Sequence, residues 1–141
     1  VAKKLGMIPP SELVVKFQPS LLDPEQKMSG SKPNTATYLN DTEEEVRKKI
    51  YRAYTGSVSL LSEHQECGAI PEICSVFMLL CYHHPDDLFV KKIQEEYVSG
   101  RMTTSELKTI TADFMVDLLR KHQEKRETIS NGDIENILLK I

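Results

Sequence analysis

The sequence contains no apolar run that approaches the roughly 18 residues needed to cross a bilayer. It also lacks the basic and then apolar start of a secretory signal peptide. Only three cysteines are present among 141 residues, an odd number that favours a reducing compartment over a secreted disulfide scaffold. These absences predict a soluble, cytoplasmic protein with no membrane partner.

The charge balance lacks the basic surplus of a protein that coats nucleic acid. The chain has 18 Lys and Arg against 21 Asp and Glu, and its 40% hydrophobic content and its length fit one globular domain. Residues 1–56 carry nine basic and seven acidic side chains, whereas residues 57–141 carry nine and fourteen. A local phosphate-binding site within residues 1–56 therefore remains possible, whereas the charge balance argues against a basic surface over the whole protein.

The beginning of the chain is typical of a segment from a longer protein. The first residue is Val1, and residues 1–5 with Gly6 are typical of a last helical turn and its C-cap. The apolar run 13–17 between prolines predicts one short buried strand. Because a lone strand cannot form a sheet, we expect its neighbours upstream.

After residue 41 the pattern is helical. Thr42 with Glu45 and Thr103 with Glu106 form capping boxes, which predict two helix starts. The apolar stretch 73–82 predicts a buried central helix.

The remaining helix boundaries follow from caps and glycines. Gly56 is expected to end the first helix, a third helix is expected from Asp86 to Gly100, and a last helix from about Asp133. Apolar spacing predicts the core-facing residues, which are Val46, Ile50, Ala53, Tyr54, Leu88, Ile93, Tyr97, Leu107, Ile110, Phe114 and Leu118. The expected fold is mainly α: one short strand and a loop, then a bundle of about five helices.

The most informative stretch lies in the polar segment 22–40, where Lys27, Met28, Ser29, Gly30 and Ser31 follow one another. Glycine permits unusual dihedrals, serine hydroxyls and backbone N–H groups bind phosphate oxygens, and lysine adds a mobile positive charge. The spacing of a Walker A loop is absent. From the residues alone, a phosphate-binding loop and a solvated surface loop both remain open.

The stretch Lys27–Ser31 resembles the K-M-S-x-S signature of class I aminoacyl-tRNA synthetases. The following Pro33-Asn34 and residues 38–42 are similar to the eukaryotic and archaeal type of tryptophanyl-tRNA synthetase. Further matching stretches are residues 62–65, 76–78, 97–102, 106–108 and Glu124. The resemblance covers nearly the whole chain, with several motifs in family order.

This resemblance implies that residues 1–41 are the C-terminal edge of a Rossmann-like catalytic domain and residues 42–141 an α-helical anticodon-binding domain. It implies an enzyme that activates tryptophan with ATP and Mg²⁺ and transfers it to tRNA(Trp). Lys27 would be catalytic, the loop Lys27–Ser31 would bind ATP phosphates, and Met28 would pack this loop against the body.

The same resemblance implies what the segment lacks. The His-Ile-Gly-His-type motif and the amino-acid pocket are not among these residues, so the segment is not expected to aminoacylate alone. The parent enzyme would be a homodimer whose contact lies mainly in the catalytic half, so the segment itself is expected to be monomeric. A tyrosyl-tRNA synthetase and a non-catalytic helical interaction module are the alternatives.

Two departures from the family pattern limit the transfer of roles. Gly30 stands in place of the second lysine of the general motif, and Lys32 either restores that charge two positions later or belongs to the surface. Val58-Ser59 is neutral where relatives often carry an Arg-Asp pair, so no anticodon contact is transferred there.

Basic residues after the loop allow two interpretations. Arg47, Lys48 and Arg52 would bind tRNA phosphates, or they form a solvated face balanced by Glu43–Arg47 and Glu45–Lys49 pairs. The same choice applies to the basic residues at positions 121, 125 and 126.

The cysteines and histidines predict no metal site. Cys81 and His84 have ligand-like spacing, but zinc needs four ligands. Cys74 and Cys81 have the seven-residue spacing of a core-facing helix, and His83 and His84 are expected at a helix end.

Overall fold

The computed structural model describes residue 6, residue 11, residues 17–57 and residues 67–138. Within these residues the regular structure is helical, and residues 17–41 are irregular apart from one isolated antiparallel bridge between Pro19 and Lys27. The elements are α1 (Glu43–Arg52), the short 3₁₀ helix η2 (Pro71–Ile73), α3 (Ser75–His83), α4 (Asp87–Val98), α5 (Thr104–Glu127) and α6 (Asn131–Leu138). The predicted helical turn 1–5 and the predicted strand 13–17 lie outside the described residues, except for the exposed Phe17.

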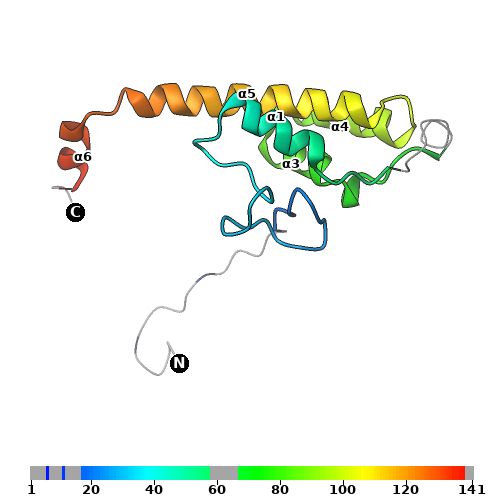
Figure 1. Ribbon diagram of the computed structural model, residues 1–141, viewed down its shortest axis with the longest axis horizontal. Coiled ribbons are helices and arrows are strands. Elements are labelled where there is room, and N and C mark those ends of the chain that lie inside the picture. The colour runs from blue at the N-terminus through cyan, green and yellow to red at the C-terminus, as the bar shows by residue number, and fades with distance from the viewer. Residues whose placement is uncertain (1–5, 7–10, 12–16, 58–66, 139–141) are drawn as a thin grey trace.

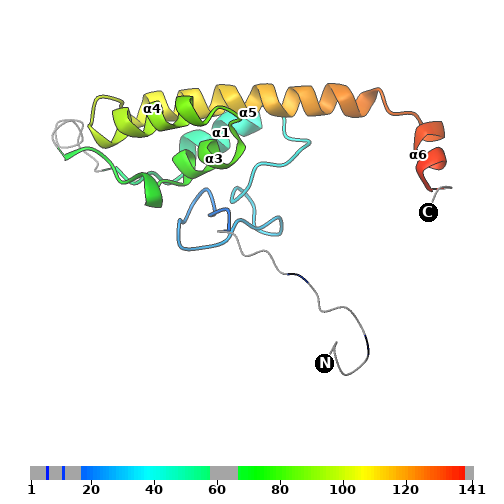
Figure 2. The same ribbon diagram turned by 180° about the vertical axis from the view of Figure 1, so that it is seen from behind.

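The long helix α5 organises the molecule (Figure 1). Helices α1, α3 and α4 pack against one side of α5. The irregular segment 17–41 lies mostly below these helices, and its last residues reach α5, where Gln123 donates to the carbonyl oxygens of Leu39 and Asp41. Helix α6 stands at the far end of α5, apart from the other helices in both views (Figure 2). The mainly α fold class is therefore confirmed.

Local caps set the helix starts. Glu45 N–H donates to Thr42 Oγ1 over 3.3 Å while the Glu45 carboxylate accepts from Thr42 N–H over 2.8 Å, and Thr103 with Glu106 repeats the arrangement. The Asp86 side chain accepts hydrogen bonds from the backbone N–H groups of Leu88 and Phe89 at the start of α4. All three predicted starts are confirmed, and the last helix begins two residues before the predicted position.

The hydrophobic core lies between α5 and the three shorter helices. Its fully buried large side chains are Leu21, Val46, Ile50, Val76, Leu79, Leu80, Tyr97 and Leu107. Burial of each such side chain stabilises the fold by about 1.5–3 kcal/mol. Since Leu21 belongs to the segment before α1, the core also anchors that segment.

Some predicted core positions are wrong. Leu88 is 80% exposed, because the buried side of α4 carries Ile93, which lies five residues or about 140° further round the helix. Tyr54 is exposed because α1 ends at Arg52, four residues before the expected Gly56. Leu118 is also exposed, at the edge of the buried face of α5.

The central helix is buried only in part. Helix α3 is two residues later than predicted at its start, so Ile73 falls in η2 and is exposed, as is Tyr82 near the other end. Cys74 caps α3 and is buried, but Cys81 is exposed. Because Cys74 precedes the helix, the seven-residue spacing does not place Cys81 on the same face.

The segment 17–41 is fastened to the helices by main-chain bonds. Tyr54 N–H donates to Leu21 O over 2.7 Å, and Leu21 N–H donates to Thr35 O over 3.0 Å. Ser75, at the start of α3, donates its hydroxyl to Ser20 O over 2.7 Å. No helix in the described part of the chain has the length and apolar character to cross a bilayer.

Candidate functional site: the signature loop and its anchor

The loop Lys27–Ser31 presents its charged end to solvent and its apolar residue to the body. Lys27 is exposed, whereas Met28 packs against the hydrophobic core. Met28 N–H donates to Gln18 O over 2.9 Å, which fixes the start of the loop. The loop therefore has a firm base and an accessible cationic side chain.

The two serines of the loop face one another. The Ser29 and Ser31 hydroxyl oxygens lie 2.9 Å apart, and Ser31 N–H points at Ser29 Oγ over 3.4 Å. Thr35, which is buried, donates its hydroxyl to the Ser29 and Lys32 carbonyl oxygens, each over 2.8 Å. Two hydroxyls and an N–H group thus gather in a turn held from below, a donor set suited to an anion.

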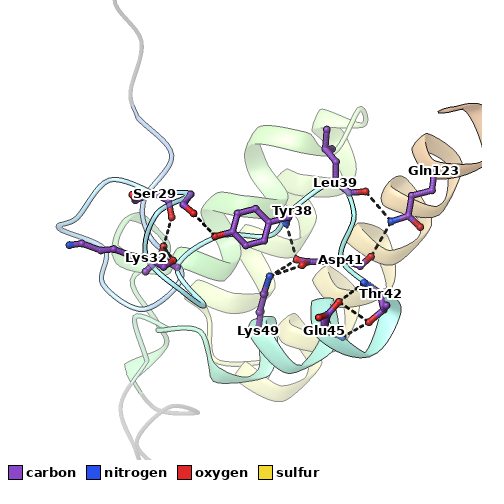
Figure 3. Close-up of polar contacts among 11 residues, drawn as sticks. Ser29, Lys32, Tyr38, Leu39, Asp41, Thr42, Glu45, Lys49 and Gln123 are labelled. Atoms are coloured by element: carbon purple, nitrogen blue, oxygen red, sulfur yellow. Dashed lines mark hydrogen bonds and ion pairs between the residues drawn. The ribbon is translucent and has the colours of Figure 1, made fainter. Parts of the chain in front are cut away.

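Lys32 does not point into this donor set. Its Nζ donates to Gln26 Oε1 over 3.0 Å, on the outside of the loop (Figure 3). In this geometry it is a surface residue with a neutral partner.

An anchor connects the loop to α1. Tyr38 donates its hydroxyl to the Gly30 carbonyl oxygen over 2.9 Å, and its backbone N–H donates to Asp41 Oδ2 over 2.8 Å. Lys49 of α1 donates to both Asp41 oxygens at 2.6–2.8 Å, and its Nζ lies 4.3 Å from the Tyr38 ring centroid (Figure 3).

Sequence reasoning missed Tyr38, Asp41 and Lys49 as a unit. A signal was present: Lys49 lies between Val46 and Ile50 on the apolar stripe of α1, where a buried ammonium needs a partner. The expected Glu45–Lys49 pair is wrong, because Glu45 is used in its capping box.

The predicted tRNA-binding residues differ in their surroundings. Arg47 pairs with Asp113 over 2.7 Å and with Glu43 over 2.9 Å, and these two carboxylates raise the pKa of its guanidinium. The expected Glu43–Arg47 pair is thus confirmed. Lys48 and Arg52 are exposed and form no ion pair with another described residue. On α1, these two are the more accessible cations.

The basic residues near the C-terminal end of α5 also include both paired and unpaired side chains among the described residues. Lys121 pairs with Asp117 over 2.6 Å, an i,i+4 pair on the helix surface. Lys125 and Arg126 are exposed one turn further on and form no ion pair with another described side chain.

The described cysteines and histidines do not converge on one site. Tyr97 donates its hydroxyl to Cys74 Sγ in the core over 3.7 Å, and the pKa of this phenol is raised mainly by its burial. At the end of α3, burial lowers the pKa of His83, and His84 stacks on Phe89 with ring centroids 4.6 Å apart. The described residues contain no group of three or more His, Cys, Asp or Glu that could hold a metal ion.

Comparison with known proteins identifies the class. Residues 1–120 match the family model of tRNA synthetases class I (W and Y), the tryptophan and tyrosine members. Because this match covers most of the chain, the chain belongs to the class I tRNA synthetases of this family.

Within the family, the similarity is to tryptophan members. The chain is 40% identical over 129 residues to the tryptophan–tRNA ligase of Sulfolobus acidocaldarius, which covers 90% of this chain and 34% of that protein. It is 31% identical over 139 residues to the cytoplasmic tryptophan–tRNA ligase of Rattus norvegicus, covering 98% of this chain and 29% of the relative. The chain therefore spans about a third of the length of these relatives, and the resemblance to the tryptophanyl family is confirmed.

Solved structures agree with this assignment. The tryptophanyl-tRNA synthetase of Giardia lamblia superposes with a TM-score of 0.86 at 31% identity, over 95% of this chain and 33% of that one. The tyrosyl-tRNA synthetase of Aeropyrum pernix gives a TM-score of 0.65 at 25% identity, over 84% and 36%. The fold is shared by both types, and the sequence is more similar to the tryptophanyl one.

Proposed function

We propose that this chain supplies the ATP-phosphate loop and the tRNA-binding helices of a tryptophan–tRNA ligase. One observation carries the proposal: in a chain of this family, the loop Lys27–Ser31 combines an exposed lysine, two converging serine hydroxyls and a methionine packed on the core. The whole enzyme would activate tryptophan with ATP to tryptophanyl-adenylate and transfer it to tRNA(Trp).

The chemistry of this loop would be electrostatic. As the carboxylate of tryptophan attacks the α-phosphorus, negative charge builds on the departing pyrophosphate. Lys27 would bind that charge as the catalytic group, while Ser29, Ser31 and the N–H groups near Gly30 would donate hydrogen bonds to it. Mg²⁺ would neutralise further phosphate charge when bound with ATP. A single well-placed donor of this type is worth about 3–4 kcal/mol in the transition state.

The remaining assignments rest on the family. We propose that residues 1–41 end the catalytic domain and residues 42–141 form the anticodon-binding domain, joined through the anchor on α1. The tRNA phosphates would contact Lys48 and Arg52, with a smaller share for Arg47, whose charge is already paired. The parent enzyme would be a cytoplasmic homodimer and this segment a monomer.

ATP–pyrophosphate exchange by the parent enzyme tests the proposal. We expect exchange with tryptophan, and we expect Lys27→Ala to lower kcat by 100-fold or more because the developing charge loses its lysine. Lys92→Ala, at a 72% exposed lysine on α4, is the matched control and should leave exchange unchanged.

The outcomes separate the alternatives. Exchange with tyrosine alone would transfer the assignment to the tyrosyl enzyme, whose fold the chain shares. No exchange with either amino acid would leave a helical interaction module. An active Lys27→Ala enzyme would contradict the catalytic role of the loop.

A further inference from the structure

Two side chains of the polar segment before α1 donate to carbonyl oxygens of the loop: Thr35 bonds to Ser29, and Tyr38 bonds to Gly30. Tyr38 lies eight residues after Gly30 and donates its hydroxyl to the Gly30 carbonyl oxygen over 2.9 Å. Figure 3 shows the ring of Tyr38 between the loop and the side chain of Lys49. The phenol thus spans the distance between the loop and α1.

This bond acts on a peptide plane that belongs to the loop. The Gly30 carbonyl and the Ser31 N–H are parts of one planar trans peptide, so a bond that directs the first also directs the second. The Ser31 N–H points toward Ser29 Oγ, which in turn lies 2.9 Å from Ser31 Oγ. Without such a constraint, glycine leaves the plane free to rotate because its backbone has the widest choice of dihedrals.

The ring of Tyr38 is itself held firmly. Its backbone N–H is bonded to Asp41, and the ammonium of Lys49 lies over its face. The Asp41 and Lys49 side chains are only 7% and 10% exposed, and their 2.6 Å ion pair has little freedom. Gln123 of α5 completes the support by donating to the carbonyl oxygens of Leu39 and Asp41 over 2.9 and 3.0 Å.

We propose that Tyr38 is a positioning residue for the signature loop, and that its hydroxyl sets the Gly30–Ser31 peptide for phosphate binding. This inference rests on the proposed function of the loop. Tyr38 itself touches no phosphate; it acts by holding the donors of Ser29 and Ser31 in one orientation before ATP arrives. Preorganised donors spend no reorganisation energy in the transition state.

The test is Tyr38→Phe in the parent enzyme, which removes the hydroxyl and keeps the ring under Lys49. We expect kcat/KM for ATP in tryptophan-dependent exchange to fall about 5-fold, the factor that corresponds to about 1 kcal/mol for one neutral hydrogen bond. KM for tryptophan should not change, because this peptide plane belongs to the phosphate loop, and the thermal midpoint should fall by no more than a few degrees.

Tyr51→Phe is the matched control. Tyr51 is an exposed tyrosine of α1 whose hydroxyl lies 3.1 Å from the Thr109 hydroxyl on α5, away from the loop. Removal of the Tyr51 hydroxyl should leave kcat/KM for ATP unchanged. A second arm combines Tyr38→Phe with Ser29→Ala and Ser31→Ala. If Tyr38 acts through these two hydroxyls, its substitution should cost less in that background than in the unaltered enzyme.

Three results would overturn the inference: unchanged ATP kinetics in Tyr38→Phe, a faster reaction in that variant, or an undiminished loss from Tyr38→Phe when Ser29 and Ser31 are alanine. Each leaves the proposed function standing, provided that Lys27→Ala is inactive. An active Lys27→Ala enzyme would instead remove the proposed function, and the inference with it.

Discussion

At the scale of the residue, Lys49 shows how one buried charge can order a polar segment. Its ammonium is 2.6 Å from the Asp41 carboxylate, and both side chains are almost fully buried. Desolvation of two charges consumes much of their attraction, so such a pair adds little net stability. Loss of one partner is a different matter, because the other charge then remains buried without compensation.

We predict that Lys49→Met lowers the free energy of unfolding by about 3–5 kcal/mol. Asp41→Asn should lower the free energy of unfolding much less in the Lys49→Met chain than in the unaltered chain. Urea unfolding of the four chains of the double-mutant cycle measures this coupling. Lys48→Met, at the exposed neighbour on the same helix, is the control and should change stability by less than about 0.5 kcal/mol. Equal effects at positions 48 and 49 would contradict the buried pair.

At the scale of the element, the helix starts are local and the helix ends are not. The capping boxes at Thr42 and Thr103 join residues three apart, so spacing alone predicts them. The end of α1 depends on distant residues: beyond Ala53 the N–H of Tyr54 donates to Leu21 O, which draws the chain out of the helix. Gly56 therefore does not end α1, although it looks like a helix stop in the sequence.

The capping box of α5 predicts a pH dependence. Hydrogen bonds from the backbone and hydroxyl of Thr103 hold the pKa of Glu106 below its ordinary value, about 4.3. A carboxyl whose pKa is lower in the folded than in the unfolded chain stabilises the fold above the unfolded pKa, and this contribution disappears as pH falls through the folded pKa. We expect Glu106→Gln to lose less stability than the unaltered chain between about pH 5 and pH 3, measured by urea unfolding.

Glu135→Gln is the control for this experiment, since Glu135 is an exposed residue of α6 outside both of these capping boxes. Its pH profile should follow that of the unaltered chain. If Glu106→Gln also follows that profile, the capping box is not a source of the acid sensitivity.

At the scale of the whole molecule, charge is distributed unevenly along the chain. The net charge is −3, yet the loop offers the exposed Lys27 and the surface of α1 offers Lys48 and Arg52. Both cationic regions lie within residues 1–56, the part of the chain whose net charge is positive. Phosphate contacts at such places add to affinity one by one and are weakened by salt.

We predict that Lys48→Ala and Arg52→Ala in the parent enzyme each make the negative slope of log K for tRNA binding against log salt less steep. The expected reduction is roughly 0.7–0.9 for each lost phosphate contact. Filter binding or fluorescence titration at several salt concentrations measures this slope. Lys92→Ala should leave it unaltered, and an unchanged slope in all three variants would place the tRNA elsewhere.

The sequence alone determined what depends on neighbours in the chain. Lys27–Ser31 defines the signature loop, two capping boxes define helix starts, and the order of motifs points to the family that comparison confirms. These features involve residues within a few positions of one another, where spacing translates directly into geometry.

The tertiary structure decided what depends on packing between segments. It exposed Leu88 and Cys81, ended α1 early, and brought Tyr38, Asp41 and Lys49 together beneath the loop. Apolar periodicity assigns a face to a helix but does not say which part of that face a distant segment will cover. The anchor of the loop arises from such a contact, because Tyr38 lies against Lys49 of α1 where the segment before α1 folds back onto the core.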